Sequence, residues 1–518
     1  MAKLQERFAE ALKALKSLQD KGIVAIYTDD IPSRMYREIL TRQGFLKEVT
    51  KGWYISSNPA EKPGETTSWY SSYWEFCARF IESKYENDWC LSADQSLAIH
   101  AGNWAVPQQL VVRSPQANNR PTPLPHNTSL FNHKGELPPA DQMTTERGLR
   151  IYNLQAALIY CTVSAFGNTG LNARTTLSLI RDASELLPVL LDKGHTTIAG
   201  RLAGAFRNIQ RDKIADQIIE SMKQAGYDAR EEDPFQSKLS IDLSQRERSP
   251  FVNRIKLMWQ QMRETVIRDF PAAPGISKDH ESYLKDVDAI YITDAYHSLS
   301  IERYKVTPEL IERVMAGKWD AQINEEDKKQ QDAMAARGYY QAFQLVKESI
   351  IKIMEGANPG KQIDADHQRW YRQLFDPSVV AGILKASDLA GYRSHQVYIG
   401  NSQHVPLSVD AMRDAMPVFF ELLANEPEAS VRAVLGHFIF VFIHPYMDGN
   451  GRMGRFLMNA MLASGGYPWT VIPVEKRDEY MKALERASTE QDVSSFSQFI
   501  SYLVKQGMNG TPVAALPK

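Results

Sequence analysis

The residues best suited to chemistry lie in one short run, residues 444–455, which reads His-Pro-Tyr-Met-Asp-Gly-Asn-Gly-Arg-Met-Gly-Arg. His444 opens the run, and its ordinary pKa, near ~6.5, suits a general base at neutral pH. Asp448 supplies a carboxylate, and Arg452 and Arg455 supply guanidinium groups. A base, an acid and two cations around a glycine-rich turn indicate a site that handles phosphate.

Apolar residues on both sides of this run recur at helical spacing. Residues 434–443 form an apolar stretch upstream. The periodic positions downstream are Phe456, Leu457, Ala460 and Met461. The spacing predicts a helix, a tight loop and a second helix that begins at residues 448–451.

The start of the second helix would be an anion-binding site. The first backbone N–H groups of a helix lack internal partners, and the helix dipole is positive there. The glycines of 449–451 would let the backbone approach a phosphate closely. Arg452 and Arg455 would bind phosphate oxygens from one helix face, and Asp448 could hold Mg²⁺ at the same phosphates. With the histidine as base, the set suggests transfer from a nucleotide to a hydroxyl.

Three other interpretations of the run are weaker. The Asn450-Gly451 dipeptide is a hairpin turn signal, but both flanks have a helical pattern. Asp448 could open a Ca²⁺-binding loop, but Asn459 stands where an EF-hand needs an acidic residue. Residues 449–454 match the spacing of the dinucleotide-binding glycines, but no βαβ pattern surrounds them.

The run resembles the signature of the Fic (Fido) family, His-Pro-Phe-x-[Asp/Glu]-Gly-Asn-Gly-Arg-x-x-Arg, with Tyr446 in place of Phe. The resemblance implies an α-helical core that transfers AMP from ATP to a hydroxyl of a target protein. It also implies roles for the site residues. His444 would be the base, Asp448 would hold Mg²⁺, and residues 449–451 would bind the α- and β-phosphates. The two arginines would bind the outer phosphates.

A second segment gains meaning beside this motif: residues 298–303, Ser-Leu-Ser-Ile-Glu-Arg. It resembles the family's inhibitory motif, [Ser/Thr]-x-x-x-Glu-[Gly/Asn], with Ser298 and Glu302 in place and Arg303 as the departure. Glu302 would pair with Arg455 and occupy the place of the γ-phosphate, so that ATP would bind misplaced for attack. Because the segment precedes the core, the resemblance is to the subclass with an N-terminal inhibitory helix. A purely structural ion pair is the alternative.

Residues 391–406 alternate in character around a Gly-Asn turn, which predicts a β-hairpin. By family resemblance this segment is a flap that clamps an extended part of the target by strand addition. Ile399, Gly400 and Asn401 would then lie near ATP or the target.

A further predicted helix follows the motif and carries Tyr480. By family resemblance, Tyr480 packs near the adenine. Ser488 stands where the family often has Asn, which leaves that contact to the base open. His437 lies on the apolar helix and is interpreted as a core histidine.

Residues 1–60 have the pattern of a winged helix-turn-helix: helices followed by a small hairpin. Ser33 is a candidate N-cap for a helix that carries Arg34, Arg37 and Arg42. The segment loosely resembles the N-terminal winged-helix domain of AbiEi-like antitoxins. Its arginines could contact DNA phosphates. The alternatives are a solvated helix face or a protein-binding module.

Residues 61–235 show no catalytic pattern. They contain an aromatic-rich helix, whose aromatic side chains are expected in the core, and a stretch at 114–145 that is rich in Pro, Asn and Thr and is predicted as loop. We interpret the region as regulatory or target-recognition structure.

Composition sets broad limits on the class of protein. Of 518 residues, 43% are apolar and 24% charged, as is ordinary for a globular protein, and a net charge of −2 gives no general attraction to nucleic acid or membrane. The three cysteines, Cys77, Cys90 and Cys161, form no CxxC pair, so neither a disulfide framework nor a cysteine zinc site is indicated. The sequence has no signal-peptide pattern and no apolar run that could span a bilayer, which predicts a cytoplasmic protein without membrane contact.

The predicted fold is mainly α. It has an all-helical Fic-type core at residues 250–505 with a β-hairpin flap, preceded by an α+β winged-helix-like region at 1–60 and a helical or α+β region at 61–235. The predicted function is that of an autoinhibited protein adenylyltransferase that uses Mg-ATP and a Ser, Thr or Tyr hydroxyl of a target protein. The alternatives are a DNA-binding, antitoxin-like regulator with a weak or self-modifying Fic core, and a Fic enzyme that uses another nucleotide. Whether the chain forms a homo-oligomer stays open.

Overall fold

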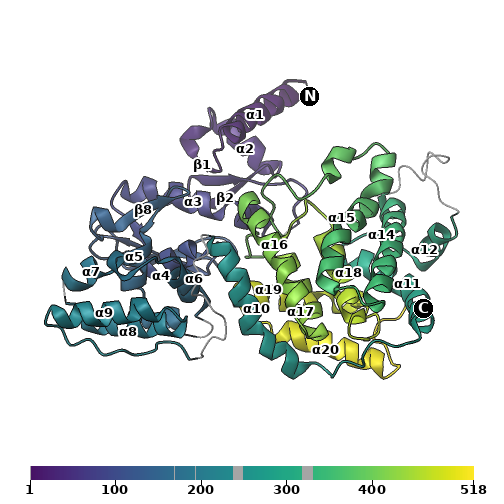
Figure 1. The fold of residues 1–518 in the computed structure, drawn as a ribbon. Helices are drawn as coiled ribbons and strands as arrows, with labels where there is room; N and C mark the ends of the chain where they lie inside the picture. Colours follow the sequence, from purple (N-terminus) through teal and green to yellow (C-terminus); the bar gives the residue numbers. More distant parts are fainter. Residues whose placement is uncertain are drawn as a thin grey trace. The chain divides into compact units, whose positions relative to one another are not determined.

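A computed structural model describes residues 2–62, 64–167, 170–192, 194–236, 249–317 and 331–517. The chain divides into two compact units, and Figure 1 shows the ribbon coloured along the sequence. The N-terminal unit is Met1–Pro250 with Tyr398–Val405, and the C-terminal unit is Phe251–Val397 with Pro406–Lys518. Every strand of the described chain lies in the N-terminal unit, so the described part of the C-terminal unit is built from helices and loops.

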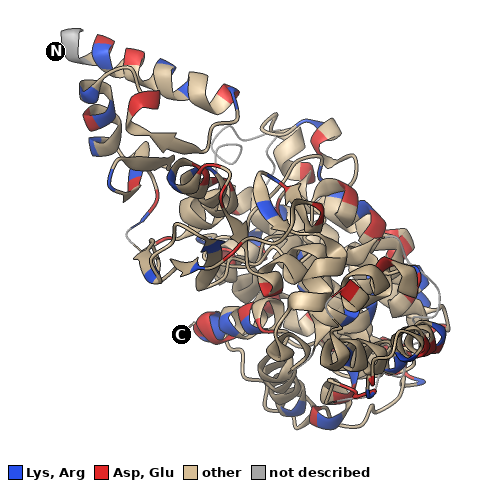
Figure 2. Ribbon diagram, turned by 90° about the vertical axis from the view of Figure 1, so that its left-hand side faces the viewer, with Lys and Arg blue, Asp and Glu red and all other residues tan. Residues whose placement is uncertain are grey.

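The first part of the N-terminal unit combines two helices with a small antiparallel sheet in the order β1-β3-β2. Its elements are α1 (Ala2–Asp20), β1 (Ala25–Tyr27), η1 (Thr28–Asp30), α2 (Arg34–Arg42), β2 (Leu46–Thr50) and β3 (Trp53–Ser56). Ser33 caps α2, because its hydroxyl accepts a hydrogen bond from the Met35 amide. Leu15, Ile26 and Leu40 join the helices and the sheet in one core. Figure 2 shows both signs of charge along the helix that begins at the N-terminus.

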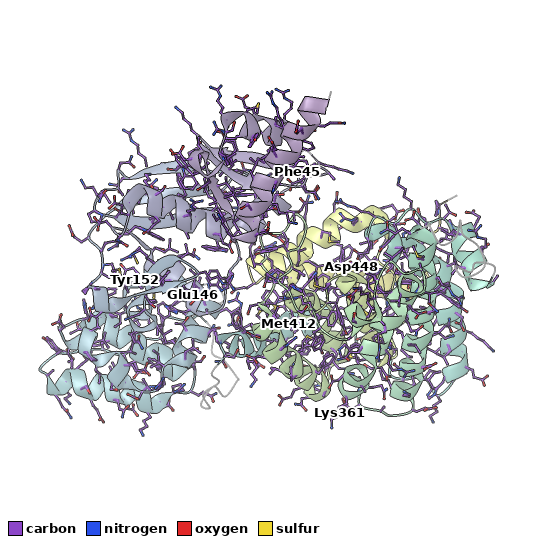
Figure 3. All side chains as sticks on the ribbon, turned by 90° about the horizontal axis from the view of Figure 1, so that it is seen from above. Phe45, Glu146, Tyr152, Lys361, Met412 and Asp448 are labelled. Carbon is purple, nitrogen blue, oxygen red and sulfur yellow. The ribbon has the colours of Figure 1, made fainter. Side chains whose placement is uncertain are left out.

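The rest of the N-terminal unit is a mixed α+β structure around a four-stranded sheet in the order β4-β5-β7-β6. Its strands and first helices are α3 (Thr67–Tyr85), β4 (Cys90–Leu91), α4 (Ala93–His100), β5 (Gln109–Ser114), β6 (Arg120–Pro123), β7 (Ser129–Lys134), β8 (Met143–Glu146) and β9 (Leu149–Tyr152). Its later helices are α5 (Leu154–Tyr160), α6 (Leu171–Leu179), α7 (Leu187–Asp192), α8 (Thr196–Asn208) and α9 (Asp212–Gln224). The aromatic residues of α3 are buried, as expected from the sequence. Glu146 and Tyr152 mark the β8–β9 hairpin in Figure 3.

The stretch at 114–145 differs from the loop that its composition predicts, because it contains β6, β7 and β8. Pro121 and Pro123 lie in β6, which is an edge strand, and an edge strand tolerates residues without an N–H donor. Asn132 of β7 is buried and donates from Nδ2 to the Arg120 carbonyl at 2.8 Å. The Pro, Asn and Thr content therefore predicted a loop where β6 is an edge strand, held by its pairing with β7.

The C-terminal unit is built from helices joined by loops in its described residues. Its helices are α10 (Pro250–Asp269), α11 (His280–Ile301), α12 (Pro308–Met315), α14 (Gln331–Met354), α15 (Pro359–Val380), α16 (Val409–Asn425), α17 (Ala429–Ile443), α18 (Asn450–Ala463), α19 (Arg477–Thr489) and α20 (Ser494–Met508). This matches the predicted helical core. No helix among the described residues of either unit combines the length and the apolar character needed to cross a membrane.

Helix α17 is the centre of this unit. All of its residues except Val441 are buried, so it is covered on every side by its neighbours. A helix that is apolar all round is stable only inside a larger assembly of helices. Its C-terminal end therefore has a fixed position, and the loop that follows starts from a rigid support.

The segment at 391–406 is not the β-hairpin that the sequence predicts. Its residues are described throughout, and none of them is in a strand. Arg393 Nη2 donates to the Leu407 carbonyl, and Gln396 Nε2 donates to the Pro406 carbonyl at 2.8 Å. The middle part, Tyr398–Val405, packs with the N-terminal unit, where the Gln403 carbonyl accepts from the Val106 amide at 2.9 Å. Side-chain bonds and contacts with another element thus replace the strand ladder.

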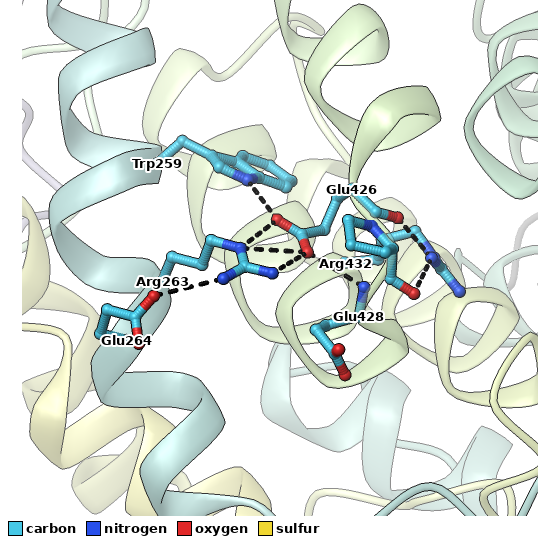
Figure 4. Close-up of polar contacts among 7 residues, drawn as sticks. Trp259, Arg263, Glu264, Glu426, Glu428 and Arg432 are labelled. Atoms are coloured by element: carbon cyan, nitrogen blue, oxygen red, sulfur yellow. Dashed lines mark hydrogen bonds and ion pairs between the residues drawn. The ribbon is translucent and has the colours of Figure 1, made fainter. Parts of the chain in front are cut away.

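A buried carboxylate joins α10 to the start of α17 (Figure 4). Glu426 is 6% exposed and accepts hydrogen bonds from Trp259 Nε1 at 3.1 Å and from Arg263 Nε at 2.9 Å. It also accepts from the Glu428 amide at 3.0 Å. A buried charge with this many partners is stable only while all of them remain.

We predict that Glu426→Ala lowers the free energy of unfolding of the C-terminal unit by about 3–5 kcal/mol, because it leaves the Arg263 guanidinium without its buried partner. Glu264→Ala is the matched control. It removes the other, exposed carboxylate on Arg263, and should cost less than about 1 kcal/mol. Urea unfolding followed by tryptophan fluorescence measures both, and equal losses for the two variants would contradict the prediction.

Candidate active site

The helix α17 ends at His444 in an unusual backbone conformation. His444 is its C-cap residue, with φ 57° and ψ 62°, in the left-handed region. Its amide still donates to the Phe440 carbonyl at 3.0 Å. A residue with a Cβ adopts this conformation at some energetic cost, and it persists only where the surroundings hold it. The position of His444 is therefore imposed by the fold.

The ring of His444 is held in one tautomer. Its Nδ1 lies 3.1 Å from the Val441 carbonyl oxygen, which can only accept, so Nδ1 carries the proton and Nε2 carries the lone pair. The pKa of His444 is lowered to about 4, chiefly by burial and also by the nearby Arg393. The bond to the Val441 carbonyl and the charges of Glu302 and Asp448 act in the opposite direction. The imidazole is thus neutral at physiological pH, which is the state that a general base needs.

The loop after His444 is fixed by Asn450. The Asn450 side chain accepts from the Tyr446 amide at 2.9 Å and donates to the Tyr446 carbonyl at 2.8 Å. The Tyr446 ring is fully buried and stacks on Tyr371 with 3.7 Å between centroids. The sequence assigned Asn450 to the phosphate cradle; its side chain is engaged in holding the loop, so only its backbone N–H can face a ligand.

The glycines of the loop leave an open backbone at the start of α18. Gly449 has φ 77°, and a Cβ there would lie 2.9 Å from the Phe375 ring. A Cβ on Gly451 would lie 2.4 Å from Glu302 Oε1. No side chain of the described chain caps α18. Its first N–H groups therefore remain available to an anion.

Arg455 joins this cradle to α11. It is 3% exposed, and its Nε donates to Ser298 Oγ at 2.7 Å. Its Nη2 donates to the Ser298 carbonyl at 3.0 Å and to Glu302 Oε1 at 2.8 Å. Within the described residues, the buried Nη1 has no hydrogen-bond partner, and it lies 3.2 Å from the place of a Cβ on Gly451. One donor of the guanidinium is therefore directed at the cradle.

Arg452 is the second buried arginine of α18. It is 1% exposed, and its guanidinium lies over the ring of Tyr304 at 5.2 Å and over the ring of Phe375 at 5.0 Å. Its Nη2 is 3.4 Å from Asp448 Oδ2. Stacked aromatic rings hold a guanidinium in place while they leave its edge free for an anion.

The carboxylate of Glu302 lies where the cradle would receive an anion. Burial raises the pKa of Glu302, but Arg455 and Arg452 outweigh it and hold the pKa below its usual value. The group is thus ionised at neutral pH. A negative oxygen beside Gly451 and Arg455 mimics the charge of a phosphate oxygen.

Asp448 is the residue of this loop that suits a divalent cation. Its side chain is 68% exposed, and its Oδ1 accepts from the Gly449 amide at 2.6 Å. Within the described ranges, no group of three or more His, Cys, Asp or Glu residues could form a protein cage for a metal. Mg²⁺ commonly takes one or two carboxylates and completes its shell with phosphate oxygens and water, so a single exposed carboxylate beside a phosphate cradle fits this ion.

A sequence model of the Fic/DOC family matches residues 362–462, which run from α15 to the end of α18 and include the loop just described. The chain carries a Fic/DOC domain.

Curated relatives match part of the chain. A protein adenylyltransferase Fic of Nematostella vectensis is 30% identical over 221 residues, which are 41% of this chain and 46% of that protein. A protein adenylyltransferase Fic of Drosophila willistoni is 39% identical over 114 residues, 21% of this chain and 22% of that protein. The chain thus spans less than half the length of each relative. Among solved structures, Fic-1 (aa134–508) from C. elegans covers 66% of this chain and 98% of its own, with a TM-score of 0.37 and 16% identity.

The structure brings together most of the predicted site residues. His444, Asp448, residues 449–451, Arg452 and Arg455 lie on one helix–loop–helix, and Ser298 and Glu302 contact Arg455 from α11. Three other predicted residues, Ile399, Gly400 and Asn401, belong to the N-terminal unit. There, Asn401 Oδ1 accepts from the Thr66 amide at 3.1 Å.

Tyr480 lies on α19 in the core of the C-terminal unit. It is 1% exposed, and its hydroxyl is 2.7 Å from His437 Nε2. Burial raises the pKa of Tyr480 to about 12 and lowers that of His437 to about 3, so both are neutral. His437 is a buried core histidine, as its place on the apolar helix predicted. Ser488 turns its hydroxyl to the Leu484 carbonyl at 2.8 Å.

Sequence reasoning missed a buried pair beneath Arg455. The Tyr339 hydroxyl donates to Asp294 Oδ2 at 2.6 Å, and both side chains are buried. Burial raises the pKa of Asp294 to about 6, while Tyr339 and Arg455 act to lower it. The sequence did contain a signal for Asp294. It precedes Ser298 and Glu302 at four-residue steps, which places all three on the same face of α11.

We predict that the acid limb of the pH–rate profile lies near pH 4, below the ordinary histidine value of ~6.5. The base acts in its neutral form, and a lowered pKa keeps it neutral at lower pH, so kcat/KM should be flat between about pH 5 and about pH 7. The profile should be measured on a variant without the Glu302 carboxylate, with circular dichroism as the control for folding. A fall in kcat/KM that begins near pH 6.5 in folded protein would contradict the prediction.

Proposed function

We propose that this chain is a protein adenylyltransferase, which transfers AMP from Mg·ATP to a Ser, Thr or Tyr hydroxyl of a target protein. The observation that carries the proposal is His444 with a free lone pair on Nε2, held beside an uncapped helix start and two buried arginines. The Fic/DOC match and relatives named protein adenylyltransferase Fic support it.

The proposed reaction is an in-line displacement at the α-phosphorus. His444 Nε2 takes the proton of the attacking hydroxyl, whose oxygen forms a bond to the α-phosphorus. The bond from the α-phosphorus to the bridging oxygen breaks, and pyrophosphate leaves with the electron pair. The N–H groups of 450–452 bind phosphate oxygens, and Arg452 and Arg455 stabilise charge on the outer phosphates. Asp448 would hold Mg²⁺, which neutralises phosphate charge when bound.

We propose further that Glu302 inhibits this reaction. Its carboxylate already bonds Arg455 Nη2 at 2.8 Å and lies against Gly451, where an outer phosphate oxygen would bind. Because the carboxylate is ionised, it repels the phosphate as well as competing with it. ATP that binds beside Glu302 would have its outer phosphates displaced from the in-line geometry.

We predict that Glu302→Gly raises label transfer from α-labelled ATP by about tenfold or more, because it frees Arg455 for the outer phosphates. Self-modification serves as the readout. Glu302→Gln keeps the size of the side chain but loses the charge, and it should give an intermediate rate. Glu302→Gly with His444→Ala should give no label. Label that persists in this double variant would exclude His444 as the base, and equal rates for wild type and Glu302→Gly at equal ATP affinity would exclude inhibition by Glu302.

The same assay separates adenylylation from use of another nucleotide. Unlabelled ATP should suppress transfer from α-labelled ATP at lower concentration than GTP, CTP or UTP. If no form is labelled by ATP although all forms are folded, transfer from the other α-labelled nucleotides tests the alternative. The proposal places the enzyme in the cytoplasm, where thiols stay reduced. The free and buried state of its three cysteines is consistent with that location.

A second candidate function is DNA contact by residues 1–60. The strand order β1-β3-β2 with α2 before the β2–β3 hairpin suits a winged helix-turn-helix. Arg34 and Arg42 are exposed on α2, although Arg34 pairs with Glu38 at 2.8 Å. Arg37 is used within the fold, because its Nη1 donates to the Thr28 carbonyl at 3.3 Å. Arg34 and Arg42 are therefore the candidates for phosphate contacts.

We predict that Arg34→Ala with Arg42→Ala weakens any DNA binding and reduces the slope of log affinity against log salt by about 2, one for each lost phosphate contact. A fluorescence-anisotropy titration of duplex DNA at several salt concentrations measures both quantities. Lys13→Ala with Lys16→Ala, on α1, is the control. Binding that is absent, or that is equally sensitive to both pairs, would remove the DNA-binding candidate.

A further inference from the structure

Arg393 is a buried arginine that contacts the loop after α17 and both ends of the segment at 391–406. These ends, residues 391–397 and 406–408, are called the stems. Arg393 is 2% exposed. Its Nε donates to the His444 carbonyl at 2.8 Å, and its Nη1 donates to the His395 carbonyl at 3.0 Å. Its Nη2 donates to the Leu407 carbonyl. Its own amide donates to the Pro445 carbonyl at 2.9 Å, so backbone and side chain hold the same turn.

These carbonyls belong to three pieces of chain that no strand pairing joins, although Gln396 also links the two sides of the segment through the Pro406 carbonyl. His395 and Leu407 stand on the two sides of the segment, which contains no strand in the structure. His444 ends α17. A planar guanidinium has its donors in a fixed fork, so it can bind three carbonyls only when they stand in one arrangement. If either stem moves, the bond to His444 must change as well.

The bond to the His444 carbonyl bears directly on the imidazole ring. The left-handed conformation of His444 must be held from outside, and Arg393 Nε holds its carbonyl. The Val441 carbonyl holds the other side through Nδ1. The ring thus has one support within α17 and one from the segment at 391–406.

The charge of Arg393 is costly to bury, which argues that it does more than fill space. In the described chain no carboxylate forms an ion pair with it, and burial lowers the pKa of Arg393 to about 10. A buried charge without a counter-ion is expensive, and neutral side chains can fill a core position without this cost. The three carbonyls are the compensation, and all three lie in the loops around the proposed base.

We infer that Arg393 is a positioning residue that couples the segment at 391–406 to His444, so that an ordered segment and a correctly oriented base are one structural state. The inference rests on the proposed function, since it concerns the base of that reaction. It assigns no chemical step to Arg393, which acts through His444. A target that orders the two stems would complete the orientation of the imidazole at the same time.

The test uses the full chain with Glu302→Gly as the parent, and compares Arg393→Gln and Arg393→Lys. Arg393→Gln should lower single-turnover transfer of α-labelled AMP by about tenfold or more, while the Kd for ATP changes less than about threefold. Arg393→Lys keeps the charge but loses the fork, so it should recover only part of the rate. The acid limb of the pH profile should move to higher pH in Arg393→Gln. The positive charge of Arg393 lowers the pKa of His444, and glutamine lacks that charge.

Arg432→Gln is the matched control (Figure 4). Arg432 is also buried on α17, and its Nη1 donates to the Glu426 carbonyl and, at 2.9 Å, to the Pro427 carbonyl. It lies near the start of α17, about 18 Å along the helix from His444. Arg432→Gln should lower stability and leave transfer by the folded protein within about twofold of the parent. An equal loss of transfer in both variants, or full transfer in Arg393→Gln, would overturn the inference.

Hydrogen exchange gives a readout that does not need transfer. In Arg393→Gln, the amides of 394–397, 406–408 and 444–446 should lose protection together. Arg432→Gln should affect only the start of α17 and the end of α18, where Arg432 Nη2 donates to Ser464 Oγ at 2.8 Å. Loss of protection in the stems with 444–446 unchanged would also overturn the inference. If the parent fails to transfer any nucleotide, the proposed function fails, and the exchange result still decides whether Arg393 couples the segment to His444.

Discussion

The buried guanidinium of Arg455 is the interaction on which the site depends. It is a permanent positive charge inside the C-terminal unit, and it is held by Ser298 and Glu302 of α11 while Nη1 remains directed at the start of α18. Asp294, one turn further back on α11, adds a second acid close to the same charge. The geometry of α11 and α18 is therefore set by one cation, and any ligand of α18 must share that cation with α11.

Much of the site could be predicted because its residues are contiguous or follow a regular spacing. The helices on either side of the loop followed from apolar periodicity, and the pairing of Glu302 with Arg455 followed from a motif with fixed positions. Arg393 could not be found this way, because its bonds go to backbone carbonyls, which every residue has, and the one at His444 is 51 positions away. Tyr339 and Asp294 are likewise 45 positions apart. The strand β6 was missed because prolines are compatible with an edge strand as well as with a loop.

The segment at 391–406 illustrates how tertiary contacts override a local sequence pattern. Residues 391–406 have alternating side chains and a Gly-Asn turn, yet Tyr398–Val405 makes its contacts with the N-terminal unit, and the stems are joined through Arg393 and Gln396. A strand needs a partner ladder along its length, and here the backbone groups find other partners. An irregular segment held by a few side chains is easier to reorganise than a hairpin.

The ionised state of Glu302 has a consequence for control of the site. Because Arg455 and Arg452 hold its pKa down, ordinary changes of pH leave the carboxylate charged, and protonation does not release it. Release must come from competition for Arg455. Linkage between two mutually exclusive partners is reciprocal: whatever draws the end of α11 away tightens ATP binding by the same factor by which ATP loosens the end of α11. In the proposed enzyme, a nucleotide that competes with Glu302 for Arg455 would therefore be an effector as well as a substrate.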